Sequence, residues 1–156
     1  MEIERKFVVR AAPADLDSHP SSAIEQGYLA IHEDGTEVRV RRRDGAAVLT
    51  VKSGGGLVRA EEEIALDGEM FERLWPLTEG RRIEKVRHLL PAPGPGIVIE
   101  VDVYAGDLAG LVLAEVEFAS EAAAVAFEPP AWLGSDVTED VRYKNQRLAV
   151  DGRPAV

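Results

Sequence analysis

The sequence predicts a mainly β, α+β fold in which eight antiparallel strands close into a barrel with a few flanking helices. Three observations support this prediction. Apolar and polar residues alternate with a period of two along most of the chain, as expected of strands. Turn-forming segments separate the alternating runs, and the links are short, which favours an antiparallel meander that closes on itself. The predicted strands cover residues 2–10, 23–32, 36–43, 46–53, 57–66, 81–90, 97–105 and 111–119.

Segments rich in glycine, aspartate, serine or proline mark the turns between these strands. They lie at residues 33–35, 44–45, 53–56 and 91–96. Glycine adopts the positive φ angles that tight turns need, and proline fixes its own φ at a turn-compatible value. Each segment therefore lets the next predicted strand run back along the previous one.

A short helix is predicted between the fifth and sixth strands. Phe71, Leu74 and Trp75 follow Gly68 with the spacing i, i+3, i+4, which places them on one face of a helix. Pro76 lacks a backbone N–H and should end or kink this helix.

Two more short helices are predicted near the end of the chain. The segment 120–127 is rich in alanine, which favours a helix. A third helix is predicted to start after Thr138, which suits an N-cap position, and to carry Val141, Asn145 and Leu148 along one face.

The composition indicates one globular domain over residues 1–150, followed by a short tail at 151–156. A chain of 156 residues with 46% hydrophobic and 29% charged residues is long enough to bury a core. The sequence has no apolar run of about 18 residues, so no membrane-spanning helix is expected. The absence of cysteine excludes disulfides, thiolate zinc sites and cysteine nucleophiles. The charged start MEIERKF is unlike a secretory signal, so we expect a cytoplasmic protein.

The net charge of −10 argues against nucleic acid as a partner, because such proteins usually present a basic surface. It does not argue against a small polyanionic substrate, because the 18 lysines and arginines can gather in one place. Where these cations lie therefore matters more than their total.

One face of nearly every predicted strand is charged, with both signs. Because successive side chains of a strand point to opposite faces, each charged set projects together. Either the charged face meets water and valines fill the barrel, or the valines pack outward under helices and the charges line a wet interior. The residues in question are Glu2, Glu4, Lys6, Glu37, Arg39, Arg41, Lys52, Arg59, Glu61, Glu63, Lys85, Arg87, Glu100, Asp102, Glu115 and Glu117.

For any single strand the solvated arrangement is favoured, because charged residues are rarely buried. The whole set favours the charged interior. Arginine dominates its cations and suits bidentate binding of phosphate, while carboxylates spaced i, i+2 on a strand can share Mg²⁺ or Mn²⁺. Cations for phosphate and acids for metal are the groups that phosphoryl transfer requires. So much buried charge would be costly unless ligand and water fill the space.

The first strand begins Glu2-Ile3-Glu4-Arg5-Lys6, which resembles the ExExK motif of the CYTH domain, also called the triphosphate tunnel metalloenzyme family. The segment Tyr143-Lys144-Asn145 resembles the closing helix of that family. The charged positions of the later strands match the family in order, at Arg39/Arg41, Lys52, Arg59/Glu61/Glu63, Lys85/Arg87, Glu100/Asp102 and Glu115/Glu117.

The resemblance implies an eight-stranded tunnel that binds a triphosphate with two divalent ions, Mg²⁺ or Mn²⁺. By position, Glu2 and Glu4 would hold one ion, and Asp102, Glu115 and Glu117 would contribute to the other. Glu61 and Glu63 would orient arginines, with a share in metal binding as the alternative, and Glu100 would support the site. The phosphates would be held by Lys6, Arg39, Arg41, Lys52, Arg59, Lys85 and Arg87.

A hypothesis for the chemistry follows from this resemblance. One metal ion and the cationic wall would neutralise the triphosphate, and the other ion, or a lysine base, would activate water. Lys85 and Lys52 are the candidates for that base; the alternative is that both only bind phosphate.

The favoured function is metal-dependent hydrolysis of triphosphate compounds, with inorganic tripolyphosphate as the substrate. The compact length and the start EIERKFVV are similar to bacterial members with that activity. The alternatives are a class IV adenylate cyclase that converts ATP to cyclic AMP and pyrophosphate, a thiamine triphosphatase, a non-catalytic nucleotide or polyphosphate sensor, and a barrel whose charged wall is only structural. We expect a small-molecule substrate without nucleic-acid or membrane partners. The oligomeric state stays open, a homodimer included.

Overall fold

The computed structural model of the protein describes residues 3–53 and 60–155. Its main feature is a nine-stranded sheet with the strand order β5-β4-β3-β2-β6-β7-β8-β1-β9, in which neighbouring strands are antiparallel. All eight predicted strands are present, with ends a residue or two from the prediction, except that residue 2 of the first strand and residues 57–59 of the fifth lie outside the described residues. The strands are β1 (Ile3–Val9), β2 (Ser21–Ile31), β3 (Glu37–Arg43), β4 (Ala46–Lys52), β5 (Glu61–Leu66), β6 (Arg82–Pro91), β7 (Val98–Tyr104), β8 (Val112–Phe118) and β9 (Leu133–Asp136).

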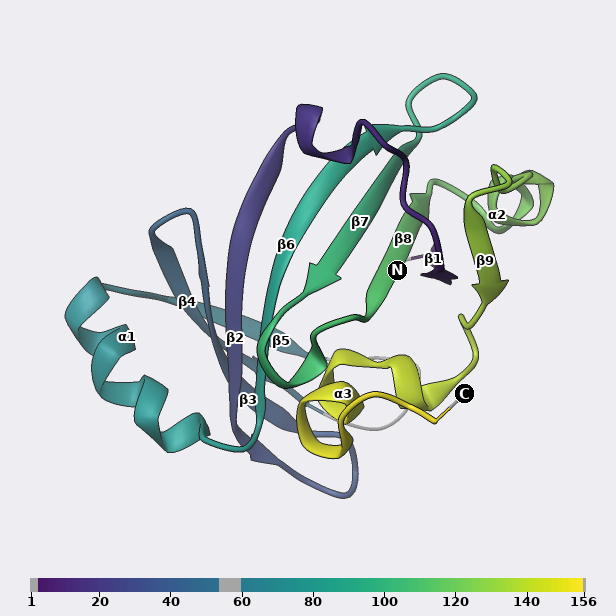
Figure 1. Ribbon diagram of the computed structural model, residues 1–156. Helices are drawn as coiled ribbons and strands as arrows, with labels where there is room; N and C mark the ends of the chain where they lie inside the picture. Colours follow the sequence, from purple (N-terminus) through teal and green to yellow (C-terminus); the bar gives the residue numbers. More distant parts are fainter. Residues whose placement is uncertain (1–2, 54–59, 156) are drawn as a thin grey trace.

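The sheet is strongly curved (Figure 1), but the described residues do not close it into the predicted barrel. β5 stands at one end of the strand order and β9 at the other. The Lys6 carbonyl accepts a hydrogen bond from the Val137 N–H at 2.8 Å, and the Lys6 N–H donates to Thr138 Oγ1 at 3.0 Å. These bonds occupy the edge of β1 that does not pair with β8. That part of β1 is therefore not available for pairing with β5, which would close the barrel. The eight-stranded closed barrel is therefore corrected to an open nine-stranded sheet over the described residues.

The ninth strand, β9, was not predicted from the sequence. It pairs with β1 through Phe7 opposite Asp136 and Val9 opposite Leu133. Gly134 permits this close approach, because a Cβ at its position would lie 2.5 Å from the Val8 carbonyl oxygen. The sequence Leu-Gly-Ser-Asp has no alternation of apolar residues, so periodicity could not indicate it.

The helix predicted after Gly68 is confirmed as α1 (Gly68–Leu74), and the 3₁₀ helix η2 (Trp75–Thr78) continues it at Pro76. The Asp67 carboxylate caps α1 by accepting a backbone hydrogen bond from its first turn at 2.8 Å. Phe71 is fully buried against Val40, so α1 covers the outer face of β3 and β4.

The helix predicted after Thr138 is present but split into two. η4 (Val141–Tyr143) is a single 3₁₀ turn, the backbone is extended at Lys144 (φ −68°, ψ 139°), and α3 (Asn145–Asp151) follows. Leu148 is buried, whereas Val141 is 58% exposed. Because the extended residue interrupts the helical period, Val141 does not share the buried face of α3, and that part of the prediction is corrected.

The remaining helical elements are short. α2 (Glu121–Ala126) confirms the alanine-rich helix and begins after Ser120, whose hydroxyl accepts the Ala123 N–H at 3.1 Å. η1 (Leu16–Ser18) and η3 (Gly106–Leu108) are single turns. Within residues 3–53 and 60–155, no helix is both long and apolar enough to cross a membrane.

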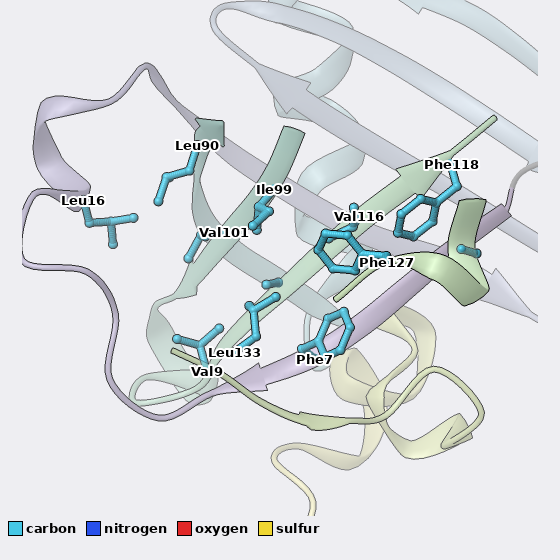
Figure 2. Close-up of a cluster of buried hydrophobic side chains, with 12 residues drawn as sticks. Phe7, Val9, Leu16, Leu90, Ile99, Val101, Val116, Phe118, Phe127 and Leu133 are labelled. Carbon is cyan, nitrogen blue, oxygen red and sulfur yellow. The ribbon is translucent and has the colours of Figure 1, made fainter. Parts of the chain in front are cut away.

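The largest apolar cluster lies on the outer face of β1, β6, β7 and β8, under α2, β9 and the η1 segment (Figure 2). Val101 and Val116 are fully buried in it. Their charged neighbours along the strands must therefore point to the opposite, inner face. At one end of that inner face, α3 buries Leu148 against Tyr104 and Leu113 in a second cluster. The prediction that valines pack outward is thus confirmed for this half of the sheet.

Candidate functional site

The inner face of the sheet carries a cavity of about 550 Å³ lined mainly by charged side chains. The predicted charged faces of seven strands contribute to it, and the first residues of α3 complete one end. The predicted residues that line it are Glu4, Lys6, Glu37, Arg39, Arg41, Lys52, Glu61, Glu63, Lys85, Arg87, Glu100, Glu115 and Glu117.

Three predicted site residues are not among the lining. Glu2 and Arg59 lie outside the described residues. Asp102 belongs to the same face of β7 as Glu100 but is fully buried beneath the cavity.

Asp102 is the centre of a buried ion cluster. Its Oδ2 accepts a hydrogen bond from Lys85 Nζ at 2.8 Å and another from Arg87 Nη2 at 2.9 Å. Its Oδ1 accepts from Arg87 Nε at 2.7 Å. Burial alone would raise the pKa of the Asp102 carboxyl, but the Arg87 hydrogen bonds and the two positive charges hold that pKa below its ordinary value. Asp102 therefore stays ionised and fixes both cations.

Lys85 is the most enclosed cation of the site. Its side chain is 4% exposed, and its Nζ lies 5.4 Å from the centroid of the Tyr104 ring. Burial lowers the pKa of the Lys85 ammonium, and the charge of Arg87 lowers it further, while Asp102 opposes both. Lys85 thus loses its proton more readily than an exposed lysine.

Arg87 links the buried cluster to the carboxylates of the cavity wall. Its Nη1 lies 2.6 Å from Glu100 Oε2, and its Nη2 lies 3.7 Å from Glu115 Oε2. Burial alone would lower the pKa of the guanidinium, but Asp102, Glu100 and Glu115 together raise it, so Arg87 is permanently charged. Lys6 is held nearby, with its Nζ 3.4 Å from Glu115 Oε1 and 3.0 Å from the Tyr143 carbonyl.

Carboxylates of neighbouring strands face one another on this wall. Glu100 lies directly opposite Glu115, and Glu117 directly opposite Glu4. Burial raises the pKa of Glu100, and the charges of Glu115 and Asp102 add to that rise against the opposing charge of Arg87. Like charges in directly opposite positions are unfavourable, and a hard cation among them would relieve the repulsion. In the part of the chain that is described, however, no three such groups are already close enough to hold an ion.

Arginines crowd the opposite wall, on β3. Burial lowers the pKa of the Arg41 guanidinium, and the charges of Arg39, Arg43 and Arg87 lower it further, with Glu63 opposing them. Arg39 Nε is buried without a hydrogen-bond partner among the described residues. This wall therefore carries more positive charge than its carboxylates neutralise, which suits a bound anion.

The cavity also has lining residues that the sequence analysis did not place there. On β2, Tyr28 lies opposite Arg39, and its hydroxyl accepts a hydrogen bond from Gln26 at 2.8 Å. Burial, with the charge of Glu37, raises the pKa of Tyr28 to about 12. Gln26 and Tyr28 lack charge, so only the period-two alternation of β2 could have indicated them. The full set is Ile24, Gln26, Tyr28, Gly35, Lys144, Asn145 and Gln146.

Comparison with known proteins places the chain in a family. It is 51% identical over 150 residues to an inorganic triphosphatase of Nitrosomonas europaea, covering 96% of this chain and 97% of that protein. An inorganic triphosphatase of Acetivibrio thermocellus is 39% identical over 153 residues, covering 94% and 92%. A crystal structure of an inorganic triphosphatase superposes with a TM-score of 0.81 at 47% identity, covering 96% of this chain and 95% of that one. No protein-family model matches the chain. The chain belongs to the family of these inorganic triphosphatases, which confirms the resemblance of its charged strands to the CYTH, or triphosphate tunnel metalloenzyme, family.

Proposed function

We propose that this protein is a metal-dependent hydrolase that cleaves inorganic tripolyphosphate. The observation that carries the proposal is the wall of cations that Arg39, Arg41 and Lys52 form along one side of the cavity. Burial, and then the charges of the neighbouring arginines, lower the pKa of Arg41. A polyphosphate chain offers repeated negative charges to such a wall. The relatives named inorganic triphosphatase support the same substrate.

The carboxylate wall supports a requirement for Mg²⁺ or Mn²⁺. Glu4, Glu115 and Glu117 line the cavity from two paired strands, and their oxygens are the ligand type that both ions prefer. We propose that these residues hold the ions, together with Glu2 by the family resemblance, and that two ions bind. When bound, the ions would neutralise phosphate charge and lower the pKa of a bound water.

The residues of the chain itself have distinct tasks in the proposed reaction. Arg39, Arg41, Lys52 and Arg87 neutralise and align the phosphate chain. Water attacks a terminal phosphorus, the bridging P–O bond breaks, and phosphate and pyrophosphate leave. Lys85 is the favoured acceptor of the proton that this water loses, because burial and Arg87 lower its pKa.

Lys52 is a less favoured candidate than Lys85 for the base. It stands between Glu37 and Glu61 in the strand register, at the edge of the cavity. Such a position suits a phosphate ligand that bridges to two carboxylates. Glu61 and Glu63 are proposed to orient the cations of β3 and β4, and Glu100 to support Arg87.

The proposal is tested by offering the purified protein tripolyphosphate, ATP and thiamine triphosphate in turn, with Mg²⁺ or Mn²⁺ and with chelator. Phosphate and pyrophosphate from tripolyphosphate, lost on chelation, are the expected products. Cyclic AMP from ATP would instead identify a cyclase, and preferential cleavage of the thiamine ester a thiamine triphosphatase. Metal-dependent thermal stabilisation without any product would identify a sensor.

A further inference from the structure

We propose that Asp102 is a positioning residue that holds Lys85 and Arg87 at the floor of the cavity, and that it is not a ligand of the metal ions. This assignment replaces the ligand role expected from the family resemblance. It rests on the proposed function only where turnover is measured.

The Asp102 carboxylate is nearly saturated with hydrogen bonds from the two cations. Asp102 lies directly opposite Arg87 in the β6–β7 register, and this places the guanidinium beside both of its oxygens. With the Lys85 bond, Asp102 accepts three hydrogen bonds of 2.7–2.9 Å. An ionised carboxylate offers about four lone-pair sites. Most of its capacity is therefore used, and its negative charge is shared by two cations.

Access separates Asp102 from the other carboxylates of the site. Its side chain is 1% exposed and is absent from the cavity lining. Glu115 does line the cavity, and its nearest cation contacts, at 3.4 and 3.7 Å, are longer than a strong hydrogen bond. Glu117 is exposed beside it. An ion in the cavity would thus meet Glu115 and Glu117 without disturbing the Asp102 cluster.

The cluster gives Lys85 and Arg87 fixed positions. A lysine ammonium has three N–H donors, and Lys85 directs one of them to Asp102. The other two positions on Nζ are left for the substrate in the cavity that Lys85 lines and, when the unprotonated amine acts as the base, for the attacking water. Arg87 uses its remaining nitrogen on Glu100 at 2.6 Å. Catalytic cations held by a neighbouring shell need no reorganisation during reaction, so loss of Asp102 should slow turnover rather than weaken substrate binding.

Direct metal binding gives the first test. Mn²⁺ is titrated by calorimetry into the intact protein and into the Asp102→Asn and Glu117→Gln variants. Glu117→Gln removes a proposed ligand and should weaken Mn²⁺ binding, whereas Asp102→Asn removes none and should leave the binding constant nearly unchanged. Equal weakening in both variants would overturn the assignment. This measurement needs no turnover, so it stands even if tripolyphosphate proves not to be the substrate.

A double-mutant cycle between Asp102 and Lys85 gives the second test. Asp102→Asn should lower kcat for tripolyphosphate without raising KM, because the site becomes more positive. Asp102→Asn combined with Lys85→Met should lose less kcat than the product of the two single losses, because both changes break the same Asp102–Lys85 pair, while loss of the Arg87 contact adds a separate part. The double variant also removes one of the buried cations that Asp102→Asn leaves uncompensated, so it keeps the test open if the single variant does not fold. Additive losses in kcat would contradict a role through Lys85.

Discussion

Arg41 and Arg42 are adjacent in the chain, yet they have opposite surroundings because β3 points them to opposite faces. Arg41 faces the cavity, where burial and other arginines lower its pKa. Arg42 lies on the outer face, where it donates hydrogen bonds to the Glu25 and Glu72 carboxylates, which raise its pKa. Its guanidinium lies 4.4 Å from the centroid of the Phe71 ring. The first arrangement suits the binding of an anion, and the second stabilises the fold.

A matched pair of substitutions separates these two roles. Arg41→Gln should lower kcat/KM for tripolyphosphate about 10- to 100-fold, because a hydrogen bond to a charged group contributes about 1.5–3 kcal/mol. It should not lower the melting temperature, since it removes a cation from a crowded wall. Arg42→Gln should leave kcat/KM unchanged and lower the free energy of unfolding by about 1 kcal/mol. The reverse pattern would show that Arg41 is structural.

Single residues also show the limit of prediction from sequence. Alternation along the strands correctly assigned the cavity-facing charges of β3 and β6, such as Arg41 and Lys85, because the strand period decides which face a side chain takes. Alternation does not indicate how deeply a side chain on the inner face is buried, so it did not distinguish buried Asp102 from exposed Glu117. Gln26 and Tyr28 were missed because uncharged side chains do not stand out from a strand pattern.

At the scale of elements, Arg5 joins three segments that are distant in sequence. Its guanidinium donates to the carbonyls of Ala124 at 3.0 Å and Phe127 at 3.1 Å, where α2 ends, and to Asp136 of β9 at 3.0 Å. It also lies 5.0 Å from the centroid of the Phe7 ring. One side chain of β1 thus holds α2 and β9 against the edge that the predicted barrel would have used for closure.

Replacing Arg5 should therefore weaken the packing of α2 and β9 against β1 and lower the stability of the fold. Arg5→Met leaves part-buried carbonyls without their donor, and we expect a loss of about 2 kcal/mol in the free energy of unfolding by urea. Arg142→Met is the matched control, because Arg142 pairs with Asp140 on the surface and should contribute nothing measurable. Equal losses in the two variants would contradict the role given to Arg5.

The Arg5–Asp136 pair should also make stability depend on pH. Burial raises the pKa of the Asp136 carboxyl, but hydrogen bonds from Thr138 and Arg5 outweigh it and leave the pKa below 3.8. A carboxyl with a lowered folded-state pKa stabilises the fold above its unfolded pKa and loses that contribution as the pH falls through the folded value. The stability difference between the natural chain and Asp136→Asn should thus be present at pH 7 and smaller at an acidic pH below the ordinary pKa of an aspartate. An unchanged difference at both pH values would refute this account.

The same edge shows why the strands were predictable and their closure was not. Eight strands follow from local alternation and turn residues, which each segment carries in its own sequence. Closure of the sheet depends on which segment pairs with the free edge of β1. Gly134 and Thr138 decide that through contacts with Val8 and Lys6, more than a hundred positions away in the chain. No local pattern contains this information.

At the scale of the whole molecule, charge is sorted by location. The chain has a net charge of −10, yet the described lining of the cavity holds seven lysines and arginines against seven glutamates. Acidic side chains therefore dominate the remaining surface, which should disfavour large polyanions such as nucleic acid while the cavity accepts small ones. The sorting supports the proposed small-molecule substrate.

A ligand bound in the cavity should stabilise the whole fold, because side chains from several strands of the sheet line the cavity. Tripolyphosphate at about 100 times its Kd should raise the free energy of unfolding by about 2.7 kcal/mol, measured by thermal unfolding with Mg²⁺. The increase should shrink as the salt concentration rises, because salt screens the attraction. Sulfate at equal ionic strength is the control and should give a smaller increase. Equal stabilisation by sulfate and tripolyphosphate would contradict a site built for a phosphate chain.

The most direct test of the proposed activity is ³¹P NMR of tripolyphosphate incubated with the purified protein and Mg²⁺. We predict that the tripolyphosphate signals decay as phosphate and pyrophosphate appear in equal amounts, and that chelator or Arg41→Gln slows the decay. Tripolyphosphate that persists unchanged with both Mg²⁺ and Mn²⁺ would contradict the account.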